Sequence, residues 1–179
     1  MPRSVLILFA HPAYHRSRAN RALVDAVQGL EGVTFHDLYE SYPDLMVDVP
    51  REQELLAEHD AVVAQHPFYW YSAPALIKEW IDLVLTHGWA YGEGGTALTG
   101  KTWLSAITSG GSEDSYGPSG GNRFSVAEFM RPFEATVALC HMRWLEPFVV
   151  HASHLVSQTE LADAALSYRE RILALQRDG

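Results

Sequence analysis

Five short apolar runs alternate along this chain with stretches of helical periodicity, and this alternation limits the folds it can adopt. The runs span Val5 to Ala10, Val33 to Asp37, Ala61 to Gln65, Thr102 to Thr108 and Trp144 to Val150. Strands that are apolar along most of their length are typical of parallel sheets that helices cover on both faces. We therefore predict a doubly wound α/β fold of five parallel strands. A length of 179 residues fits one domain, residues 1–179.

Helical patterns fill the intervals between these runs. Ser17 is a plausible N-cap, so the first helix is expected to begin near it and to run to about Gly29. The others are expected between Pro50 and His59, from about Pro74 to Leu85, from Ser125 to Leu139 and from Thr159 to Leu175. The helix that begins near Pro74 has a wide apolar face, which favours contacts with both the sheet and a partner chain.

The composition excludes several functional classes. A formal net charge of −9 argues against non-specific nucleic-acid binding, which needs clustered Lys and Arg. The single cysteine, Cys140, excludes an internal disulfide and fits a reducing cytoplasm. Its apolar neighbours predict a buried structural thiol rather than a nucleophile. The first apolar run is too short for a signal peptide or a membrane span, so we expect a cytoplasmic protein.

An aromatic segment follows the third apolar run. The run stops at His66-Pro67, four aromatics follow from Phe68 to Tyr71, and Pro74 is well suited to open a helix. Four consecutive large rings cannot all face one core. They suit a loop that holds something flat. In a doubly wound sheet, ligands bind at the carboxyl ends of the strands, which directs attention to residues 11–17, 67–73 and 109–123.

The first of these loops offers a phosphate site. A helix that begins near Ser17 presents free N–H groups and a positive dipole end, and Ser17, Asn20, Arg18 and His11 add donors and charge. Taken alone, a capped helix with solvated arginines explains the segment equally well. Because His11 and His15 have no Asp, Glu or Cys close by, we expect no metal site.

The third loop carries paired glycines directly after a strand. Gly110 and Gly111 allow a ligand to approach the backbone closely, while Thr108 and Ser109 add hydroxyls. Tyr116 adds a ring with a phenolic donor. Taken alone, this segment is better explained as a flexible surface loop. The strand ends lack the aspartate cluster of a phosphoacceptor domain, so the three loops together point to flavin mononucleotide (FMN).

Residues 92–97 match the letters of a dinucleotide-binding fingerprint, but the context is wrong. That fingerprint needs a strand before it and a helix after it, whereas Trp89 and Tyr91 precede this segment and a strand follows it. We interpret it instead as a glycine-rich loop near a pocket, with Trp89 and Tyr91 as its aromatic content.

With these loops in view, the chain resembles the flavodoxin-like quinone reductases, and in particular the ancillary flavoproteins of glutathione-regulated potassium-efflux systems. The matching segments are Ala10-His11-Pro12, Ser17-Arg18-Ala19-Asn20, His66-Pro67, Trp70-Tyr71-Ser72, Lys78-Glu79-Trp80-Ile81-Asp82, His87-Gly88-Trp89-Ala90-Tyr91-Gly92 and Thr108-Ser109-Gly110-Gly111. They occur in order over nearly the whole chain. The resemblance implies a flavodoxin-like fold, bound FMN, NAD(P)H as co-substrate, quinone reduction, and a homodimer with active sites at the interface.

The resemblance also implies roles for single residues. The phosphate and ribityl chain would lie against His11, Ser17, Arg18, Ala19 and Asn20. The isoalloxazine ring would lie against Phe68, Tyr69, Trp70, Tyr71, Thr108, Ser109, Gly110 and Gly111. Tyr116 matches a tyrosine that stabilises the charge arising on the reduced ring. Some relatives carry a histidine a few residues later, but here residues 117–122 contain none.

Three functions stay open at this point. The first is an FMN-dependent NAD(P)H:quinone oxidoreductase, with Trp89 and Tyr91, from the partner chain, as candidates for the substrate wall; ordinary interface packing explains these two residues nearly as well. The second is a regulatory subunit of a potassium-efflux transporter, which would bring the protein to the inner membrane through its partner. The third is a flavin-binding electron carrier without substrate turnover.

Overall fold

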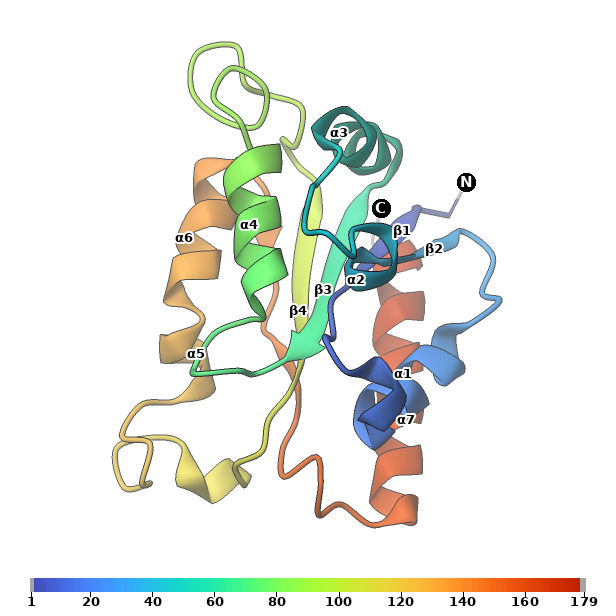
Figure 1. The fold of residues 1–179 in the computed structure, drawn as a ribbon, viewed down its shortest axis with the longest axis vertical. Coiled ribbons are helices and arrows are strands. Elements are labelled where there is room, and N and C mark those ends of the chain that lie inside the picture. The colour runs from blue at the N-terminus through green and yellow to red at the C-terminus, as the bar shows by residue number, and fades with distance from the viewer. Residues whose placement is uncertain (1, 178–179) are drawn as a thin grey trace.

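The computed structural model describes residues 2–177 and contains one parallel sheet with helices on both faces (Figure 1). The strands are β1 (Val5–Phe9), β2 (Val33–Asp37), β3 (Ala61–Pro67), β4 (Thr102–Thr108), β5 (Arg143–Trp144) and β6 (Phe148–Val150). Their order is β2-β1-β3-β4-β5, with β6 also beside β4. All the pairings among them are parallel. The predicted fold class is confirmed.

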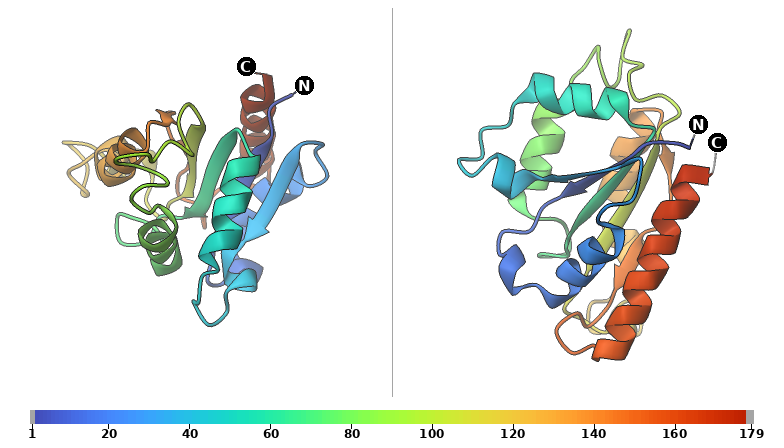
Figure 2. Two further views of the ribbon diagram at one scale, coloured as in Figure 1. Left: turned by 90° about the horizontal axis from the view of Figure 1, so that it is seen from above. Right: turned by 90° about the vertical axis from the view of Figure 1, so that its right-hand side faces the viewer.

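The two faces of the sheet bury separate apolar cores. One face packs against α3 (Val49–Glu58), α4 (Ala75–Val84) and α6 (Arg131–Leu139), and the other against α1 (Arg18–Val27) and α7 (Gln158–Arg177) (Figures 1 and 2). Successive β1 residues alternate between them, because side chains alternate across a strand. Burial on both faces explains why the strands are apolar without a period of two.

The last predicted strand, residues 144–150, is wrong as a single element. It is two short strands, of which β5 pairs with the start of β4 and β6 with its end. Pro147 lies between them and has no N–H to donate to β4. The Leu145 N–H still donates to the Trp103 carbonyl at 2.9 Å, so this edge stays attached to the sheet through the break.

The predicted helix over residues 125–139 is likewise two elements. They are α5 (Val126–Phe129) and α6, which meet at Met130. Pro132 lies in the first turn of α6, where proline can begin a helix but not continue one. The sequence also gave no sign of α2 (Leu38–Ser41), a single turn capped by the Asp37 side chain. These differences lie outside the strand ends that carry the site.

A buried carboxylate ties α3 to its neighbours. Glu52 is fully buried and accepts hydrogen bonds from His36 Nε2 at 2.7 Å, from Trp80 Nε1 at 2.8 Å and from the Tyr42 hydroxyl. Burial acts to raise the pKa of this carboxyl, but the three hydrogen bonds outweigh it and the pKa is lowered. Glu52 therefore stays charged within the core and joins α3 to β2 and α4.

The glycine-rich segment lies at the far end of the molecule. Residues 85–101 connect α4 to the start of β4, and they project beyond the edge of the sheet at which the strands begin (Figure 1). Residues 92–97 line neither of the two hollows described below, and their position near a pocket stays a prediction. Across residues 2–177 we find no helix with the length and apolar character that a membrane span needs.

Candidate functional site

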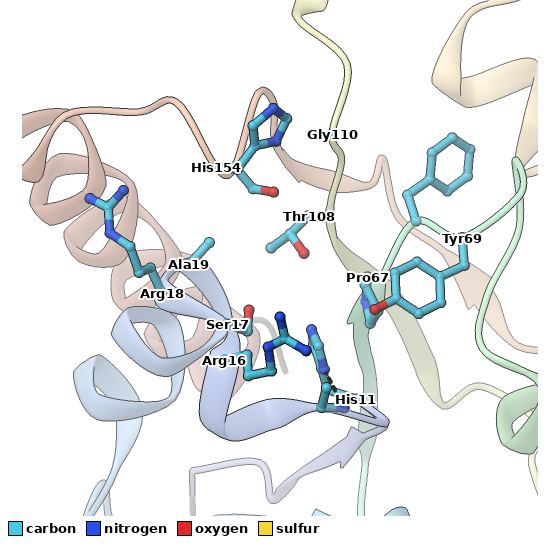
Figure 3. Close-up of a pocket in the computed structure, with 13 residues that line it drawn as sticks. His11, Arg16, Ser17, Arg18, Ala19, Pro67, Tyr69, Thr108, Gly110 and His154 are labelled. Carbon is cyan, nitrogen blue, oxygen red and sulfur yellow. Dashed lines mark hydrogen bonds between the residues drawn. The ribbon is translucent and has the colours of Figure 1, made fainter.

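A cavity of about 550 Å³ lies at the carboxyl ends of the central strands (Figure 3). Its walls come from the segments that follow β1, β3, β4 and β6. The lining residues are His11, Ala13, Arg16, Ser17, Arg18, Ala19, Pro67, Phe68, Tyr69, Thr108, Gly110, Ser153 and His154. The three predicted loops therefore meet at one place, as expected for a doubly wound sheet.

His11 forms a fixed donor in this wall. The side chain is only 8% exposed, and its Nδ1 accepts a hydrogen bond from the Ala13 N–H at 3.0 Å, drawn as a dashed line in Figure 3. Burial lowers the pKa of His11, which favours the neutral ring. A neutral ring whose Nδ1 accepts must carry its proton on Nε2. His11 thus offers an Nε2–H group to a ligand in the cavity.

The N-terminus of α1 gives one end of the cavity its anion-binding character. The Ser17 Oγ caps the helix by accepting from the Asn20 N–H at 3.2 Å. The N–H groups of Arg18 and Ala19, in the first turn, have no carbonyl to bond within the helix. Arg16 adds positive charge at the same wall, whereas the Arg18 guanidinium donates to the Val156 carbonyl at 3.3 Å and points away from the cavity in Figure 3. These groups suit a phosphate.

A second hollow of about 270 Å³ adjoins the first. It is lined by Phe68, Trp70, Tyr71, Gly110, Gly111, Tyr116 and Asn122. Phe68 and Gly110 belong to both hollows, so the two form neighbouring parts of one elongated site. One part is rich in charged donors and the other in aromatic rings. This arrangement suits a ligand with a phosphate at one end and a flat ring at the other.

The four consecutive aromatics have different surroundings, as their spacing predicted. Phe68 is buried, while Trp70 is 92% exposed at the tip of the loop. Trp70 and Tyr71 both have positive φ, at 49° and 63°, a conformation that is rare for bulky residues. Tyr71 is supported by stacking on Phe129, with ring centroids 4.7 Å apart. The turn therefore holds a tryptophan in solvent at the rim of the second hollow.

The glycine loop fits closely against Tyr116. A Cβ on Gly111 would lie 3.1 Å from the Tyr116 hydroxyl and 2.6 Å from the Ser115 Oγ, so a side chain there would displace one or both. The Ser109 hydroxyl donates to the Gly111 carbonyl at 3.0 Å. The Phe68 N–H donates to the Thr108 carbonyl at 2.8 Å, which joins this loop to the aromatic one.

The structure does not bring every predicted site residue to the cavity. Asn20 and Ser109 are fully buried and line neither hollow, so they support the wall from behind. Trp89 and Tyr91 lie in the loop at the opposite end of the sheet (Figure 1). Within one chain they do not line the site. Their contribution from a partner chain stays a prediction.

A fourth segment, directly after β6, completes the wall and was missed. Ser153 and His154 line the first hollow. The His151 Nδ1 lies 3.2 Å from the Ser109 Oγ, and its ring centroid lies 5.5 Å from that of Tyr116. The rule that directed attention to the other loops applies here too, because the predicted last strand ended at Val150. Residues 151–154 follow a strand end in the same way.

In residues 2–177, no group of three or more His, Cys, Asp or Glu side chains is arranged to hold a metal ion. Cys140 is buried, and burial raises the pKa of its thiol, which disfavours the reactive thiolate. The residues that line the two hollows offer hydrogen-bond donors, positive charge and aromatic surfaces.

Comparison with known proteins agrees with this geometry. A family model described as having a flavodoxin-like fold matches residues 3–172. The chain belongs to this flavodoxin-like family. The glutathione-regulated potassium-efflux system ancillary protein KefG of Pectobacterium carotovorum is 48% identical over 169 residues, which cover 94% of this chain and 92% of that protein. The resemblance identified from the sequence is confirmed.

Two solved structures of the same fold are also similar. The general stress protein 14 of Treponema denticola, in complex with FMN, is 40% identical with a TM-score of 0.92, and the match covers 97% of this chain and 99% of that one. An NADPH-quinone reductase of P. pentosaceus is 31% identical with a TM-score of 0.87, and covers 94% and 96%. This member of the flavodoxin-like family therefore shares its whole fold with both.

Proposed function

We propose that this protein is an FMN-dependent NAD(P)H:quinone oxidoreductase. The observation that carries the proposal is the elongated site, in which a donor-rich hollow at the start of α1 adjoins an aromatic hollow. A related structure holds FMN, and another is an NADPH-quinone reductase. When bound, FMN supplies the hydride acceptor and donor that links NAD(P)H to a quinone.

The phosphate end would be held by the first loop. His11, Ser17, Arg18 and Ala19 all line the same hollow, where the His11 Nε2–H, the Ser17 hydroxyl and the free N–H groups of the first turn would donate to the phosphate. Arg16, which the sequence did not single out, adds a cation to this set. Charge-assisted hydrogen bonds of this kind fix the position of a phosphate as well as its affinity.

The ring end would be held between the aromatic and glycine loops. Phe68 and Tyr71 supply apolar surface, and the lack of a side chain at Gly111 lets Ser115 and Tyr116 pack closely against the loop that lines the hollow. Tyr116 lines this hollow, where its phenolic O–H is a donor toward negative charge on the ring. The exposed Trp70 would cover the rim and limit access of water.

The substrate wall would come from a second copy of the chain. Trp89 and Tyr91 lie too far from the cavity of their own chain, so a homodimer is needed to bring them to a flavin. In this proposal NAD(P)H and the quinone occupy the same position in turn.

A second role is favoured by the relatives. The matched protein of Pectobacterium carotovorum is an ancillary protein of a glutathione-regulated potassium-efflux system. We infer that the chain also acts as the regulatory partner of such a transporter, as a cytoplasmic protein that reaches the membrane through this contact. The two roles are compatible, because a flavin site can serve sensing as well as turnover.

The decisive experiment uses the purified protein. We expect yellow material or stoichiometric binding of added FMN, bleaching by NADPH or NADH without oxygen, and recovery of colour on addition of menadione. Failure to bind FMN would overturn the cofactor and the reaction together. If FMN binds and is bleached but no quinone restores the colour, the protein is a flavoprotein and the proposed quinone reductase activity is overturned. Potassium efflux from cells that express the transporter with and without this chain tests the second role.

A further inference from the structure

A chain of buried polar side chains runs from α7 to the wall of the cavity. We propose that Tyr168 determines which group donates and which accepts in each hydrogen bond along this row of side chains. It thereby makes the Ser17 and Thr108 hydroxyls donors to the phosphate of the ligand. This inference rests on the proposed function and assigns positioning roles to residues that do not touch the ligand.

The chain links four elements through side chains alone. The Tyr168 hydroxyl of α7 lies 2.9 Å from Gln65 Oε1 of β3, and Gln65 Nε2 lies 3.3 Å from Asn20 Oδ1 of α1. Asn20 Nδ2 lies 2.9 Å from the Thr108 Oγ1 at the end of β4. Tyr168, Gln65 and Asn20 are fully buried, so each polar atom must find its partner within the protein.

The direction of the chain is set at Tyr168. Burial raises the pKa of Tyr168 above its usual value, so the phenol keeps its proton. A buried O–H must donate, and the acceptor within reach is Gln65 Oε1. The Gln65 amide is then oriented with its nitrogen toward Asn20, which in turn must present Oδ1 to Gln65. Each amide orientation follows from the one before it.

Asn20 donates hydrogen bonds to two hydroxyls and so determines where their own hydrogens point. Its Nδ2 has two hydrogens, which are donated to the Ser17 Oγ at 3.2 Å and to the Thr108 Oγ1 at 2.9 Å. Each hydroxyl accepts from Asn20, so its own hydrogen points away from Asn20. Ser17 and Thr108 both line the first hollow, and Figure 3 draws both among its lining residues. The hydrogens are therefore available to an anion in the hollow.

The opposite direction would remove these donors. If Asn20 presented Oδ1 to Ser17 and Thr108, both hydroxyls would donate inward and turn their lone pairs toward the ligand. Lone pairs repel a phosphate, whereas O–H groups stabilise it. Asn20, predicted from the sequence to contact the cofactor, is in this view a positioning residue.

The test is Tyr168→Phe, which removes the hydroxyl and keeps the ring. We expect the Kd for FMN to rise at least about tenfold, the scale of one hydrogen bond to a charged group. The Kd for riboflavin, which has no phosphate, should stay unchanged. Tyr42→Phe is the matched control, because the Tyr42 hydroxyl is also buried but bonds to Glu52 in the other core. It should alter neither affinity.

A double-mutant cycle tests the route of the effect. If Tyr168 acts through the two hydroxyls, Tyr168→Phe should have no further effect on FMN affinity in a Ser17→Ala, Thr108→Val background. Gln65→Met breaks the same chain at the next link and replaces Tyr168→Phe if that variant does not fold. Equal losses for FMN and riboflavin, or no loss for FMN, would overturn the inference while leaving the proposed function intact. Failure of the wild type to bind FMN would instead overturn the proposed function, and the phosphate role with it.

Discussion

At the scale of single residues, the shape of the site depends on tight packing between its loops as much as on its hydrogen-bonding groups. Gly111 touches Tyr116 so closely that any side chain must displace the tyrosine or Ser115. Gly121 lies further along the same segment, and a Cβ there would meet nothing within 4 Å. These two glycines therefore separate the effect of crowding from that of lost backbone freedom.

We expect Gly111→Val to weaken FMN binding about tenfold, because overpacking a tight contact costs about 1–3 kcal/mol and moves Tyr116. Gly121→Val should bind FMN as the wild type does. Fluorescence titration of both variants at equal folded fraction measures the difference. Equal affinities for the two variants would mean that the ring does not lie against this loop.

His66 is the residue whose titration should matter most for stability. It is fully buried at the end of β3, its Nδ1 lies 3.0 Å from the Pro67 carbonyl, and its Nε2 has no partner in the described residues. Burial lowers its pKa from 6.5 to about 4. The unfolded chain therefore binds a proton at higher pH than the folded chain. Stability from this group is complete above about pH 6.5 and is lost as the pH falls toward 4.

We expect His66→Phe to reduce the loss of stability between pH 7 and pH 4 by about 3 kcal/mol relative to the wild type. Urea unfolding of the ligand-free protein at several pH values measures it. Parallel profiles for His66→Phe and the wild type would contradict the assignment.

At the scale of elements, Glu52 decides whether α3 stays attached. Its three donors come from β2, from α4 and from the segment before α3. Replacing the Glu52 carboxylate by an amide exchanges one acceptor oxygen for an NH2 group, so a buried donor loses its partner. A buried donor without a partner destabilises the fold more than the loss of an exposed ion pair does.

We expect Glu52→Gln to lower the free energy of unfolding by about 3 kcal/mol. Glu54→Gln, on the exposed side of the same helix, should change it by less than about 0.5 kcal/mol. Chemical denaturation measures both. A small effect at Glu52 would show that a neutral amide satisfies the same donors.

The elements also show where prediction from the sequence ends. The strand ends could be located because apolar runs stop at His11, at His66-Pro67 and at Ser109, and parallel topology brings them to one edge. The break at Pro147 and the division at Met130 depend on which neighbour each residue packs against, which no local pattern contains. Asn20 was predicted to contact the cofactor, but it lies behind the wall, where its partners Gln65 and Thr108 are distant in sequence and Gln65 in turn bonds to Tyr168.

At the scale of the whole molecule, the proposed function gives one chain all of its phosphate end but only part of its substrate wall. Trp89 and Tyr91 lie at the end of the sheet away from their own cavity. If they complete a neighbouring site, substrate binding should depend on them while cofactor binding should not.

We therefore expect Trp89→Ala to raise KM for a quinone several-fold, the effect of losing an aromatic contact, and to leave the Kd for FMN within about twofold. Light scattering at several protein concentrations gives the oligomeric state of the wild type and of Trp89→Ala. Leu166→Ala, at an exposed position on α7, is the control and should leave KM unchanged. An unchanged KM for Trp89→Ala in a stable dimer would exclude this wall.

The position of α7 has a consequence for how the protein is made. Together with α1, this helix covers one face of the sheet, and it follows every strand in the sequence. Until it docks, apolar residues of β1, β3 and β4 on that face remain open to water in the growing chain. We therefore expect a chain in which α7 is not docked to expose this half of the sheet and to be prone to aggregation, until Tyr168 reaches Gln65.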